Sequence, residues 1–554
     1  MEFKNCESQK LELDQACVVF INKNSDFNSW IYALASDCVL CPFRKIAYLK
    51  NDQNTSIIFN SQKSWIWWII NGTNSPDYKS PIDKSDVKCE IKAKLGEYGI
   101  YQVLYDSTCN LKTIKQPSNS YIPLVILIGV LVLFFSLISL GKIIFKRWRK
   151  NLSSKNDIEV IEKPSKKRIQ SVDTFRGMSI LTMIFVNNGA GGYEILEHAT
   201  WNGLYVGDLV FPCFLWIMGV CIPIALNSQL SRGVSKLSII KNIIKRSCIL
   251  FFLGLCLNTL GTDSNLEHIR IFGVLQRFGV AYLIVALSYT LLNSRISTKF
   301  EHGVFSYLND IISLLSQWIF IICILIVHCV ITFCLKVPGC PTGYLGPGGL
   351  HEEGKYFNCT GGSAGYIDRL ILGNNHLYQY SSISSVYQAG PFDPEGILGC
   401  FTTIIQAFLG VQAGTILRVY KDWRSRTMRW LILAVIYACI GVILHFSSYV
   451  PVNKNLWSIS FVFITTSFAL AVFTACYLLI DVVQLWNGGP FRIPGMNALV
   501  MYIGHQMCYQ IFPFHWKYGL MNSHTWKTIA ALWDTGCWTV IAYVLHHKRI
   551  YVSL

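Results

Sequence analysis

Apolar residues are distributed unevenly along this chain of 554 residues. From about residue 121 onward they form long runs separated by shorter polar segments, whereas residues 1–120 contain no run of that length. A helix needs roughly 20 mostly apolar residues to cross a bilayer. The pattern therefore predicts a membrane domain preceded by a domain that lies outside the membrane.

Residues 1–120 consist of short alternating stretches, such as CVVFI at residues 17–21, separated by Asn, Asp, Ser and Gly. This pattern is typical of short strands, so we expect a small β-rich domain. Its cysteines are Cys6, Cys17, Cys38, Cys41, Cys89 and Cys109. Together with glycosylation sequons at Asn54 and Asn71, they indicate an oxidising compartment and hence a lumenal domain.

The spacing of Cys38 and Cys41 would also suit zinc binding or redox exchange. No second cysteine pair follows at zinc-finger spacing, so we expect disulfides. The start at Met1 leads into no apolar segment of a signal peptide. We therefore expect either that the true N-terminus is missing from this sequence or that the first membrane helix translocates the domain before it.

The rest of the chain predicts a polytopic α-helical membrane protein with about eleven transmembrane helices. The first helix covers residues 121–145, a basic linker covers 146–171, and ten further helices lie within 172–554. These ten spans begin near residues 172, 203, 247, 271, 311, 396, 428, 456, 495 and 528.

Basic residues set the expected orientation, because cytoplasmic loops are enriched in Lys and Arg. Such residues cluster at 146–150, 232–246, 421–429 and 548–549. The long polar segment at 337–395 has Cys340, Cys359 and a sequon at Asn358, which indicates the opposite side. We therefore predict a lumenal N-terminal domain, a lumenal segment at 337–395 and a cytosolic C-terminus.

Composition agrees with a membrane protein: 52% of the residues are hydrophobic, 14% are charged, and the mean hydropathy is +0.38. The net charge of +16 could also indicate a nucleic-acid partner. The basic residues lie beside apolar runs instead of forming a stripe on a soluble domain, so we expect the lipid bilayer and no nucleic acid as a partner.

The densest polar cluster within apolar sequence spans residues 171–212. His198 is its most reactive candidate, and Asp208, about one turn into the next span, could orient the imidazole. Asn188 and Asn202 offer neutral hydrogen-bond donors, and Trp201 offers a face for a sugar ring. A solvated histidine and a simple helix cap with glycines are the structural alternatives.

Other polar groups at membrane depth are expected to line a path or to pack between helices. Arg277 needs a carboxylate, a carbonyl or a phosphate as partner, and we assign it to a phosphate-bearing donor together with Arg246 and Asn187. We assign Trp201, Asn202 and Glu395 to the acceptor. The chain has no P-loop, GxGxxG, HExxH or GxSxG motif, and we expect no metal.

Several long strings resemble those of the heparan-alpha-glucosaminide N-acetyltransferases of lysosomal membranes. They are RIQSVDTFRG at 168–177, HATWNGLYVGDLVFPCF at 198–214, GVLQRFGVAY at 273–282, PGCPTGYLGPGG at 338–349, NCTGGSAGYIDRL at 358–370, DPEGILG at 393–399, AFLGVQAG at 407–414 and VNKNLW at 452–457. The resemblance runs nearly end to end.

The resemblance implies acetyl-CoA as donor, the terminal glucosamine of heparan sulfate as acceptor, His198 in the active site, a lysosomal membrane location and a homodimer. An imidazole can accept the acetyl group or deprotonate the amine, and the sequence leaves both routes open. In either route, Asn188 would stabilise the oxyanion. An acyltransferase with another acceptor and a secondary transporter of a sugar or anion are the alternative functions.

Overall fold

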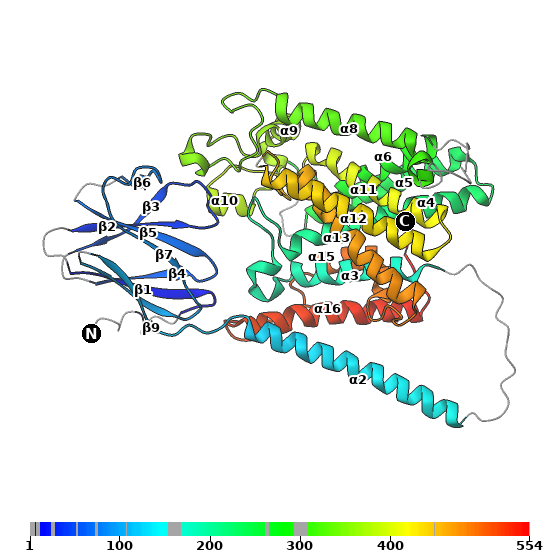
Figure 1. The fold of residues 1–554 in the computed structure, drawn as a ribbon, viewed down its shortest axis with the longest axis horizontal. Coiled ribbons are helices and arrows are strands. Elements are labelled where there is room, and N and C mark those ends of the chain that lie inside the picture. Colours follow the sequence, from blue (N-terminus) through cyan, green and yellow to red (C-terminus); the bar gives the residue numbers. More distant parts are fainter. Residues whose placement is uncertain are drawn as a thin grey trace.

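The computed structural model describes Cys6 and residues 11–23, 28–50, 54–72, 76–106, 108–152, 168–260, 265–292, 308–447 and 449–552. A β-rich domain lies at one end of a larger helical domain (Figure 1). We call the end of the helical domain that faces the β-rich domain the β end, and the opposite end, where helices such as α4 finish, the basic end.

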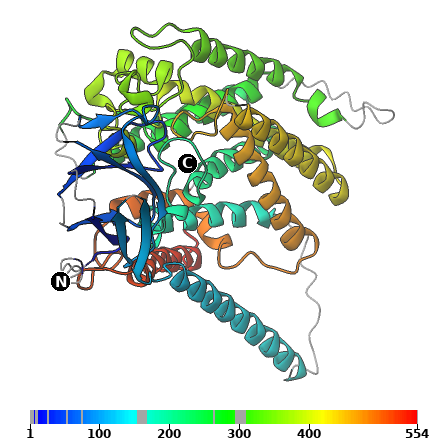
Figure 2. The same ribbon diagram turned by 60° about the vertical axis from the view of Figure 1, so that its left-hand side comes forward.

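In its described residues, the β-rich domain contains nine strands in two sheets. They are β1 (Gln15–Asn22), β2 (Ser29–Ala35), β3 (Phe43–Leu49), β4 (Asn54–Asn60), β5 (Ser64–Asn71), β6 (Tyr78–Lys79), β7 (Val87–Lys94), β8 (Ile100–Tyr105) and β9 (Cys109–Lys115). The strand orders are β4-β1-β8-β9 and β6-β3-β2-β5-β7. The two layers are visible in Figure 2. Within the first sheet, β1 and β8 pair in parallel, whereas the second sheet is antiparallel throughout.

Strand β1 is buried on both faces because its successive side chains point in opposite directions. Val18 and Phe20 join the core between the sheets, where the Phe20 ring meets the edge of Trp67 at 5.4 Å. Cys17 and Val19 join a second cluster on the other face. The domain is further linked by disulfides, which are Cys6–Cys17, Cys38–Cys41 and Cys89–Cys109. The expected disulfide at Cys38 and Cys41 is thus confirmed.

The helical domain begins with α2 (Ile122–Leu152), which lies at the periphery and starts beside the beginning of the last long helix (Figure 1). The other long helices are α3 (Gln170–Asn187), α4 (Val206–Ser231), α5 (Lys236–Asn258), α6 (Val274–Leu292), α8 (Leu315–Cys334), α11 (Ile397–Val419), α12 (Trp423–Phe446), α13 (Ile459–Cys476) and α16 (His524–His547). Shorter ones are α7 (Asn309–Ile312), α9 (Gly362–Leu372), α10 (Ser382–Tyr387), α14 (Arg492–Met496) and α15 (Ala498–Met507). The span expected to begin near residue 495 is therefore broken into α14 and α15.

Helices α4 and α11 form the centre of the domain, and glycines let their backbones approach closely. A Cβ atom added at Gly219 would lie 1.9 Å from the carbonyl oxygen of Ala407, and one at Gly410 would lie 2.1 Å from that of Trp216. Small residues at such crossings are typical of helix pairs in membranes. The crossing fixes the position of α4, which leads into the functional site.

Seven helices are long and apolar enough to cross a membrane, among the residues that the structure describes: α4, α6, α8, α11, α12, the segment Ile459–Val482, and α16. Exposed apolar side chains cover α8, α12 and α16, as expected for a lipid-facing surface. A mostly helical membrane protein with a β-rich N-terminal region is thus confirmed, while eleven spans and the division into segments stay predictions. Of the basic linker expected at 146–171, residues 153–167 lie outside the described part.

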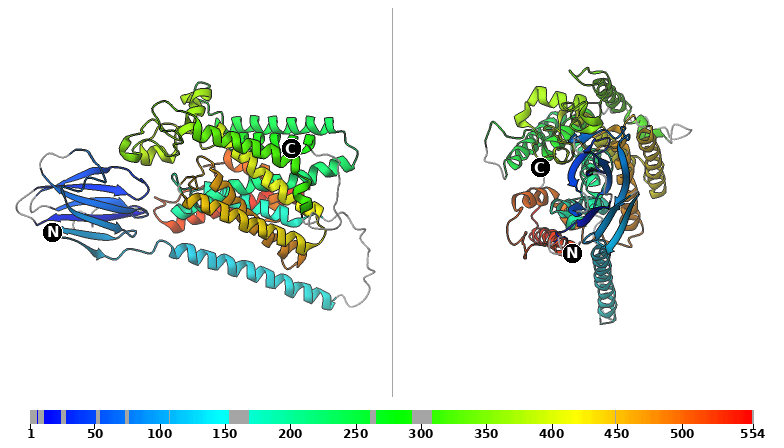
Figure 3. Two further views of the ribbon diagram at one scale, coloured as in Figure 1. Left: turned by 45° about the horizontal axis from the view of Figure 1, so that its top comes forward. Right: turned by 90° about the vertical axis from the view of Figure 1, so that its left-hand side faces the viewer.

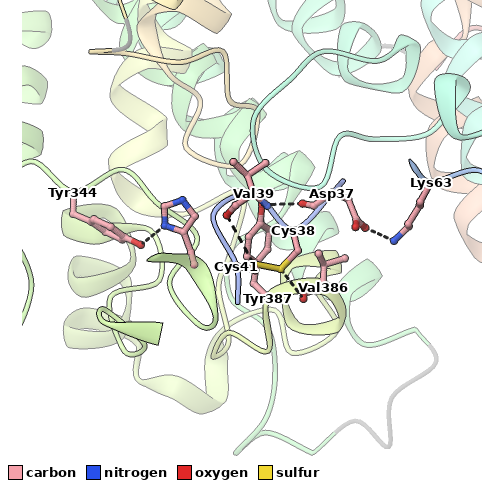
Figure 4. The surroundings of a disulfide bond; sticks show 9 residues. Asp37, Cys38, Val39, Cys41, Lys63, Tyr344, Val386 and Tyr387 are labelled. Atoms are coloured by element: carbon pink, nitrogen blue, oxygen red, sulfur yellow. Dashed lines mark hydrogen bonds and ion pairs between the residues drawn. A yellow bond between two sulfur atoms is a disulfide. The ribbon is translucent and has the colours of Figure 1, made fainter. Parts of the chain in front are cut away.

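The segment at 337–395 covers the β end and contacts the β-rich domain. It contains α9 and α10 and the disulfide Cys340–Cys359. The Tyr387 hydroxyl donates to the carbonyl of Asp37 at 2.9 Å and accepts from the Val39 N–H at 3.2 Å, beside the Cys38–Cys41 disulfide (Figure 4). The β-rich domain therefore rests on the ends of the helices, as the view along the long axis in Figure 3 shows.

Candidate active site

Asp208 lies in the first turn of α4 and organises the loop before this helix. Its Oδ2 atom accepts the backbone N–H groups of Ala199 at 3.1 Å and Tyr205 at 3.0 Å. The Tyr205 carbonyl in turn accepts the Asp208 N–H at 3.1 Å. A carboxylate at this position satisfies a free N–H group and is favoured by the helix dipole. The fully buried carboxylate is therefore held in one position.

His198 is the side-chain partner of Asp208, with 2.9 Å between Nδ1 of the imidazole and Oδ1 of the carboxylate. Gly207 makes room for the ring, because a Cβ atom there would lie 2.8 Å from Nδ1. When Nδ1 donates to the carboxylate, the neutral ring has its lone pair on Nε2. Nε2 has no hydrogen-bond partner among the described residues, and the side chain is 45% exposed. This arrangement can supply a general base or a nucleophile.

Lys454 completes the group, although the sequence analysis did not select it. Its Nζ atom lies 3.0 Å from Nδ1 of His198 and 3.5 Å from Oδ1 of Asp208. Both the ammonium and the imidazole can donate to the same carboxylate, so Asp208 keeps a cationic partner when His198 is neutral. A signal existed in the sequence, since Lys454 lies within the VNKNLW string of the resemblance.

The loop with Lys454 is fixed to the loop with His198 by amide hydrogen bonds. Asn453 donates its Nδ2 to Oδ1 of Asn202 at 3.1 Å, and Asn455 donates to the Thr200 carbonyl at 3.0 Å. The Gly203 N–H also donates to the Val452 carbonyl at 2.9 Å. Asn202, which we expected to bind the acceptor, therefore has a partner within the protein and positions Lys454.

Glu395 lies in an ion-pair network near this group. Arg270 donates from Nη2 to Oε2 of Glu395 at 2.6 Å and forms two bonds to Asp393, at 2.6 and 2.9 Å. The pKa of Glu395 is lowered: burial acts to raise it, but nearby cations outweigh burial. These cations are Arg270, Arg277 and Lys454. Glu395 is thus an anion that links this network to Lys454.

Arg277 lies in the first turn of α6 at the β end and is 1% exposed. Its Nη2 donates to the Gly396 carbonyl at 3.1 Å, and its guanidinium lies 5.0 Å from the Trp457 ring centre. Its Nε and Nη1 atoms have no hydrogen-bond partner among the described residues. We expected Arg277 to bind a donor phosphate beside Arg246. Arg277 is not among the residues that line the cavity containing Arg246, and this role stays a prediction.

A cavity of about 930 Å³ enters the helical domain between α3, α4, α5 and α6. Its polar lining includes Arg168, Arg176, Lys245 and Arg246, and no Asp or Glu is among its lining residues. The inner lining is apolar and reaches Phe211, one turn beyond Asp208 along α4. A cavity wall with a group of basic side chains and a long apolar stretch suits a ligand that has phosphates at one end and an apolar chain at the other. Arg246, which we expected to bind a donor phosphate, lies in the lining of this cavity.

The asparagines at the end of α3 have partners away from His198. Asn188 donates to the Ile184 carbonyl at 3.0 Å and to the Asp534 carboxylate on α16. Asn187 bonds through Nδ2 to Nε2 of His505 at 2.9 Å. Neither asparagine hydrogen-bonds to His198 or lines the cavity within the described residues. The structure therefore does not bring either asparagine to His198, and their roles as oxyanion donor and donor-binding residue stay predictions.

Trp201 is also placed differently from the expectation. The side chain is 3% exposed, its Nε1 donates to the Leu345 carbonyl at 3.0 Å, and its ring meets Phe392 edge-on at 5.6 Å. A buried indole with a satisfied N–H group acts in packing. Trp201 therefore fixes the His198 loop against the segment at 337–395 and leaves no ring face for a sugar.

Membrane-length helices, a buried carboxylate that orients a partly exposed imidazole, and a cavity with basic side chains in its wall suit a membrane enzyme that transfers acyl groups. The comparisons with known proteins agree with this class. A family model described as "Heparan-alpha-glucosaminide N-acetyltransferase, catalytic" matches residues 168–300, which include His198 and Asp208.

Two curated proteins named heparan-alpha-glucosaminide N-acetyltransferase align over nearly the whole chain. The mouse protein is 35% identical, and the alignment covers 98% of this chain and 89% of the mouse protein. The human protein is 36% identical, with 98% and 88% covered. The chain therefore belongs to the heparan-alpha-glucosaminide N-acetyltransferase family of enzymes, and the resemblance inferred from the sequence is confirmed.

Proposed function

We propose that this enzyme transfers an acetyl group from acetyl-CoA to the amine of the terminal α-glucosamine of heparan sulfate. The names of the relatives support the reaction and the acceptor. The observation that supports the site is the His198–Asp208 pair, which presents an unpaired Nε2 atom at the β end. On this basis, His198 reacts, Asp208 orients its ring, and Lys454 helps to balance the carboxylate.

Acetyl-CoA would enter the cavity from the basic end. Lys245 and Arg246 would bind its phosphates, because ammonium and guanidinium groups form strong charge-assisted bonds to phosphate. The apolar interior would contact the pantetheine chain and direct the thioester toward Phe211. The donor would thus approach the His198 end of the helical domain from within.

Two routes follow from a neutral His198. In the first, Nε2 attacks the thioester carbonyl, the C–S bond breaks, the thiol of CoA leaves, and the acetyl group later passes to the sugar amine. In the second, Nε2 removes a proton from the amine while the amine attacks the thioester carbonyl directly; the C–S bond then breaks, and CoA leaves as the thiol after its sulfur takes the proton from the imidazolium. The position of Nε2 serves both routes.

The distribution of disulfides and basic residues supports an orientation with the β-rich domain in the lumen, and the family resemblance supports a lysosomal membrane. All disulfides of the described residues lie in the β-rich domain or in the segment at 337–395, both at the β end. Disulfides form in oxidising compartments. The basic end and the C-terminus would then face the cytosol, where acetyl-CoA is made available. A homodimer stays a prediction of the family resemblance.

The decisive experiment measures acetyl transfer from labelled acetyl-CoA to a fluorogenic β- or α-glucosaminide by the detergent-purified protein. We expect His198→Ala to lower the transfer rate by about 10³-fold or more, because a positioned base or nucleophile contributes 10²–10⁴-fold. The control His268→Ala changes an exposed histidine and should keep full activity. Unchanged turnover in His198→Ala with intact folding would reject His198 as the reacting group.

A second experiment separates the two routes. The enzyme is mixed with labelled acetyl-CoA without an acceptor, denatured and freed of the donor. Label that stays on wild-type protein and is absent from His198→Ala indicates an acetylated imidazole. Absence of label from an enzyme that is active with acceptor indicates direct transfer.

A further inference from the structure

Three side chains that the acetyl-transfer site does not use meet where the β-rich domain rests on the start of α16. Asp14 precedes β1, Glu97 lies between β7 and β8, and His524 is the first residue of α16. Glu97 and His524 are buried, at 6% and 3% exposure. Nε2 of His524 lies 3.0 Å from Oδ1 of Asp14 and 3.8 Å from Oε2 of Glu97.

The other nitrogen of His524 determines what this cluster can do. Nδ1 lies 2.9 Å from the carbonyl oxygen of Gly191, which can only accept a hydrogen bond, so Nδ1 must carry a proton. In the neutral ring, Nε2 then presents a lone pair to two carboxylates that also present only lone pairs. Three acceptors at these distances need a shared cation or additional protons.

The arrangement matches the known geometry of protein metal sites. A metal-bound imidazole usually donates its other N–H to a carbonyl or carboxylate, as Nδ1 does to Gly191. The three candidate ligand atoms of Asp14, Glu97 and His524 lie within 4.8 Å of one another. Zinc binds nitrogen and oxygen ligands at about 2.0–2.2 Å, which places neighbouring ligands of one ion roughly 3–3.5 Å apart. Small side-chain movements would therefore complete the site.

The position of the cluster also shields an ion from solvent. Glu97 and His524 are buried, and Asp14 is partly buried. The ring of His524 is held in place by Tyr193, whose ring is stacked on it at 4.4 Å between centres.

We propose that Asp14, Glu97 and His524 bind a divalent cation of the zinc type that fastens the β-rich domain to the helical domain. Zinc fits better than calcium, because one ligand is an imidazole nitrogen, whereas calcium takes 6–8 oxygen ligands. Two carboxylates would balance the charge of the ion. The sequence analysis expected no metal, and ligands this far apart in the chain leave no sequence motif that could have indicated this site.

The site would also act on the loop that leads to His198. Gly191 accepts from His524, and the neighbouring Gly192 accepts through its carbonyl from Nε2 of Gln62 at 2.6 Å. A bound ion would hold this loop between the β-rich domain and α16. The ion would not contact the transferred acetyl group. Its role would be to hold the two domains together and to position the loop.

The test uses the full-length protein in detergent. The protein is stripped with a chelator, incubated with zinc chloride, dialysed and analysed for metal content and thermal unfolding. We expect wild type to retain about one zinc ion per chain that is missing from Asp14→Asn and from His524→Gln. Zinc should also raise the unfolding temperature of wild type, because a ligand that binds only the folded state stabilises it, and should not raise that of the two variants.

His351→Gln is the matched control, since it changes another histidine beside a carboxylate, Glu352, at 3.8 Å. This variant should retain the zinc of wild type and its thermal shift. Free cysteines would bind the same amount of zinc in all four proteins, so the difference in zinc content between the proteins does not include it. A wild-type protein that retains no zinc, or variants that retain as much as wild type, would overturn the proposal.

Discussion

The two ends of the helical domain are built on opposite principles. At the β end, charged groups are paired with each other and fixed by backbone hydrogen bonds, as with Asp208, His198 and Lys454. In the cavity, Arg168 and Arg176 pair with Asp173, whereas Lys245 and Arg246, near the middle of α5, have no carboxylate partner among the described contacts. The first arrangement holds the His198 ring in one orientation, whereas Lys245 and Arg246 leave positive charge available for a polyanionic ligand.

This difference has a thermodynamic reason. A catalytic group must be held in its reactive orientation before the substrate arrives, so its partners belong to the protein. A binding site for phosphates gains most when its cations are not already neutralised by carboxylates. Variants at the β end should therefore lower kcat, and variants at the basic end should raise KM for the donor.

The largest effect of this comparison is expected for Asp208→Asn. The amide would no longer hold the imidazole as an anion does, so the ring would lose the orientation that leaves the lone pair on Nε2. We expect kcat to fall by about 10²-fold with little change in KM, measured by steady-state acetyl transfer. A thermal unfolding curve close to that of wild type serves as the folding control. A change confined to KM would contradict the assigned role.

Lys454→Met tests the residue that only the structure revealed. Removal of the ammonium leaves Asp208 with His198 as its only side-chain partner among the described contacts, and weakens the alignment of the two loops. We expect kcat to fall by about tenfold, the range of a supporting residue behind a reacting group. Lys355→Met, which changes an exposed lysine in the segment at 337–395, should be unaffected. Equal kcat values for Lys454→Met and Lys355→Met would contradict a role for Lys454 in the reaction.

Arg246→Ala tests the basic end. Loss of one charge-assisted bond to phosphate costs roughly 1.5–3 kcal/mol, which corresponds to a rise of about tenfold or more in KM for acetyl-CoA. The rate at saturating donor should stay near that of wild type. Arg424→Ala is the control, because Arg424 is exposed and lies outside the cavity lining. A fall in kcat without a change in KM would contradict donor binding at this end.

The smallest effect concerns stability and Asp368, which supports the β end. Burial raises the pKa of Asp368 to about 7, although its bond from the Ile397 N–H acts in the opposite direction. A carboxyl with a raised pKa in the folded state binds more protons there than in the unfolded state, between about pH 4 and pH 7. Its contribution to the free energy of unfolding therefore falls as the pH rises through this window.

Asp368→Asn removes this titration and keeps an oxygen that can accept from Ile397. Relative to wild type, the variant should gain thermal stability as the pH rises from about 4 to 7, by a few degrees at most. The measurement is the difference in unfolding temperature between the two proteins at several pH values. A difference that does not change with pH would contradict the raised pKa.

The sequence was informative wherever neighbouring residues carry the signal. The apolar runs predicted the membrane helices, the alternating stretches predicted the β-rich region, and the spacing of His198 and Asp208 predicted a pair across a helix start. The sequence did not indicate which distant groups a side chain would contact. Asn188, for example, bonds to Asp534 on α16, and Arg277 bonds to the carbonyl of Gly396.

By itself, the sequence determined the class of the molecule and its family, and it selected the histidine that we propose as the reacting group, because hydrophobic periodicity and long motifs act locally along the chain. The tertiary structure alone decided that Lys454 joins His198, that Trp201 is buried against the segment at 337–395, and that Asp14 and Glu97 meet His524. Those contacts depend on how the β-rich domain and the loops rest on the helix ends. Since this packing joins segments hundreds of residues apart, no local pattern could encode it.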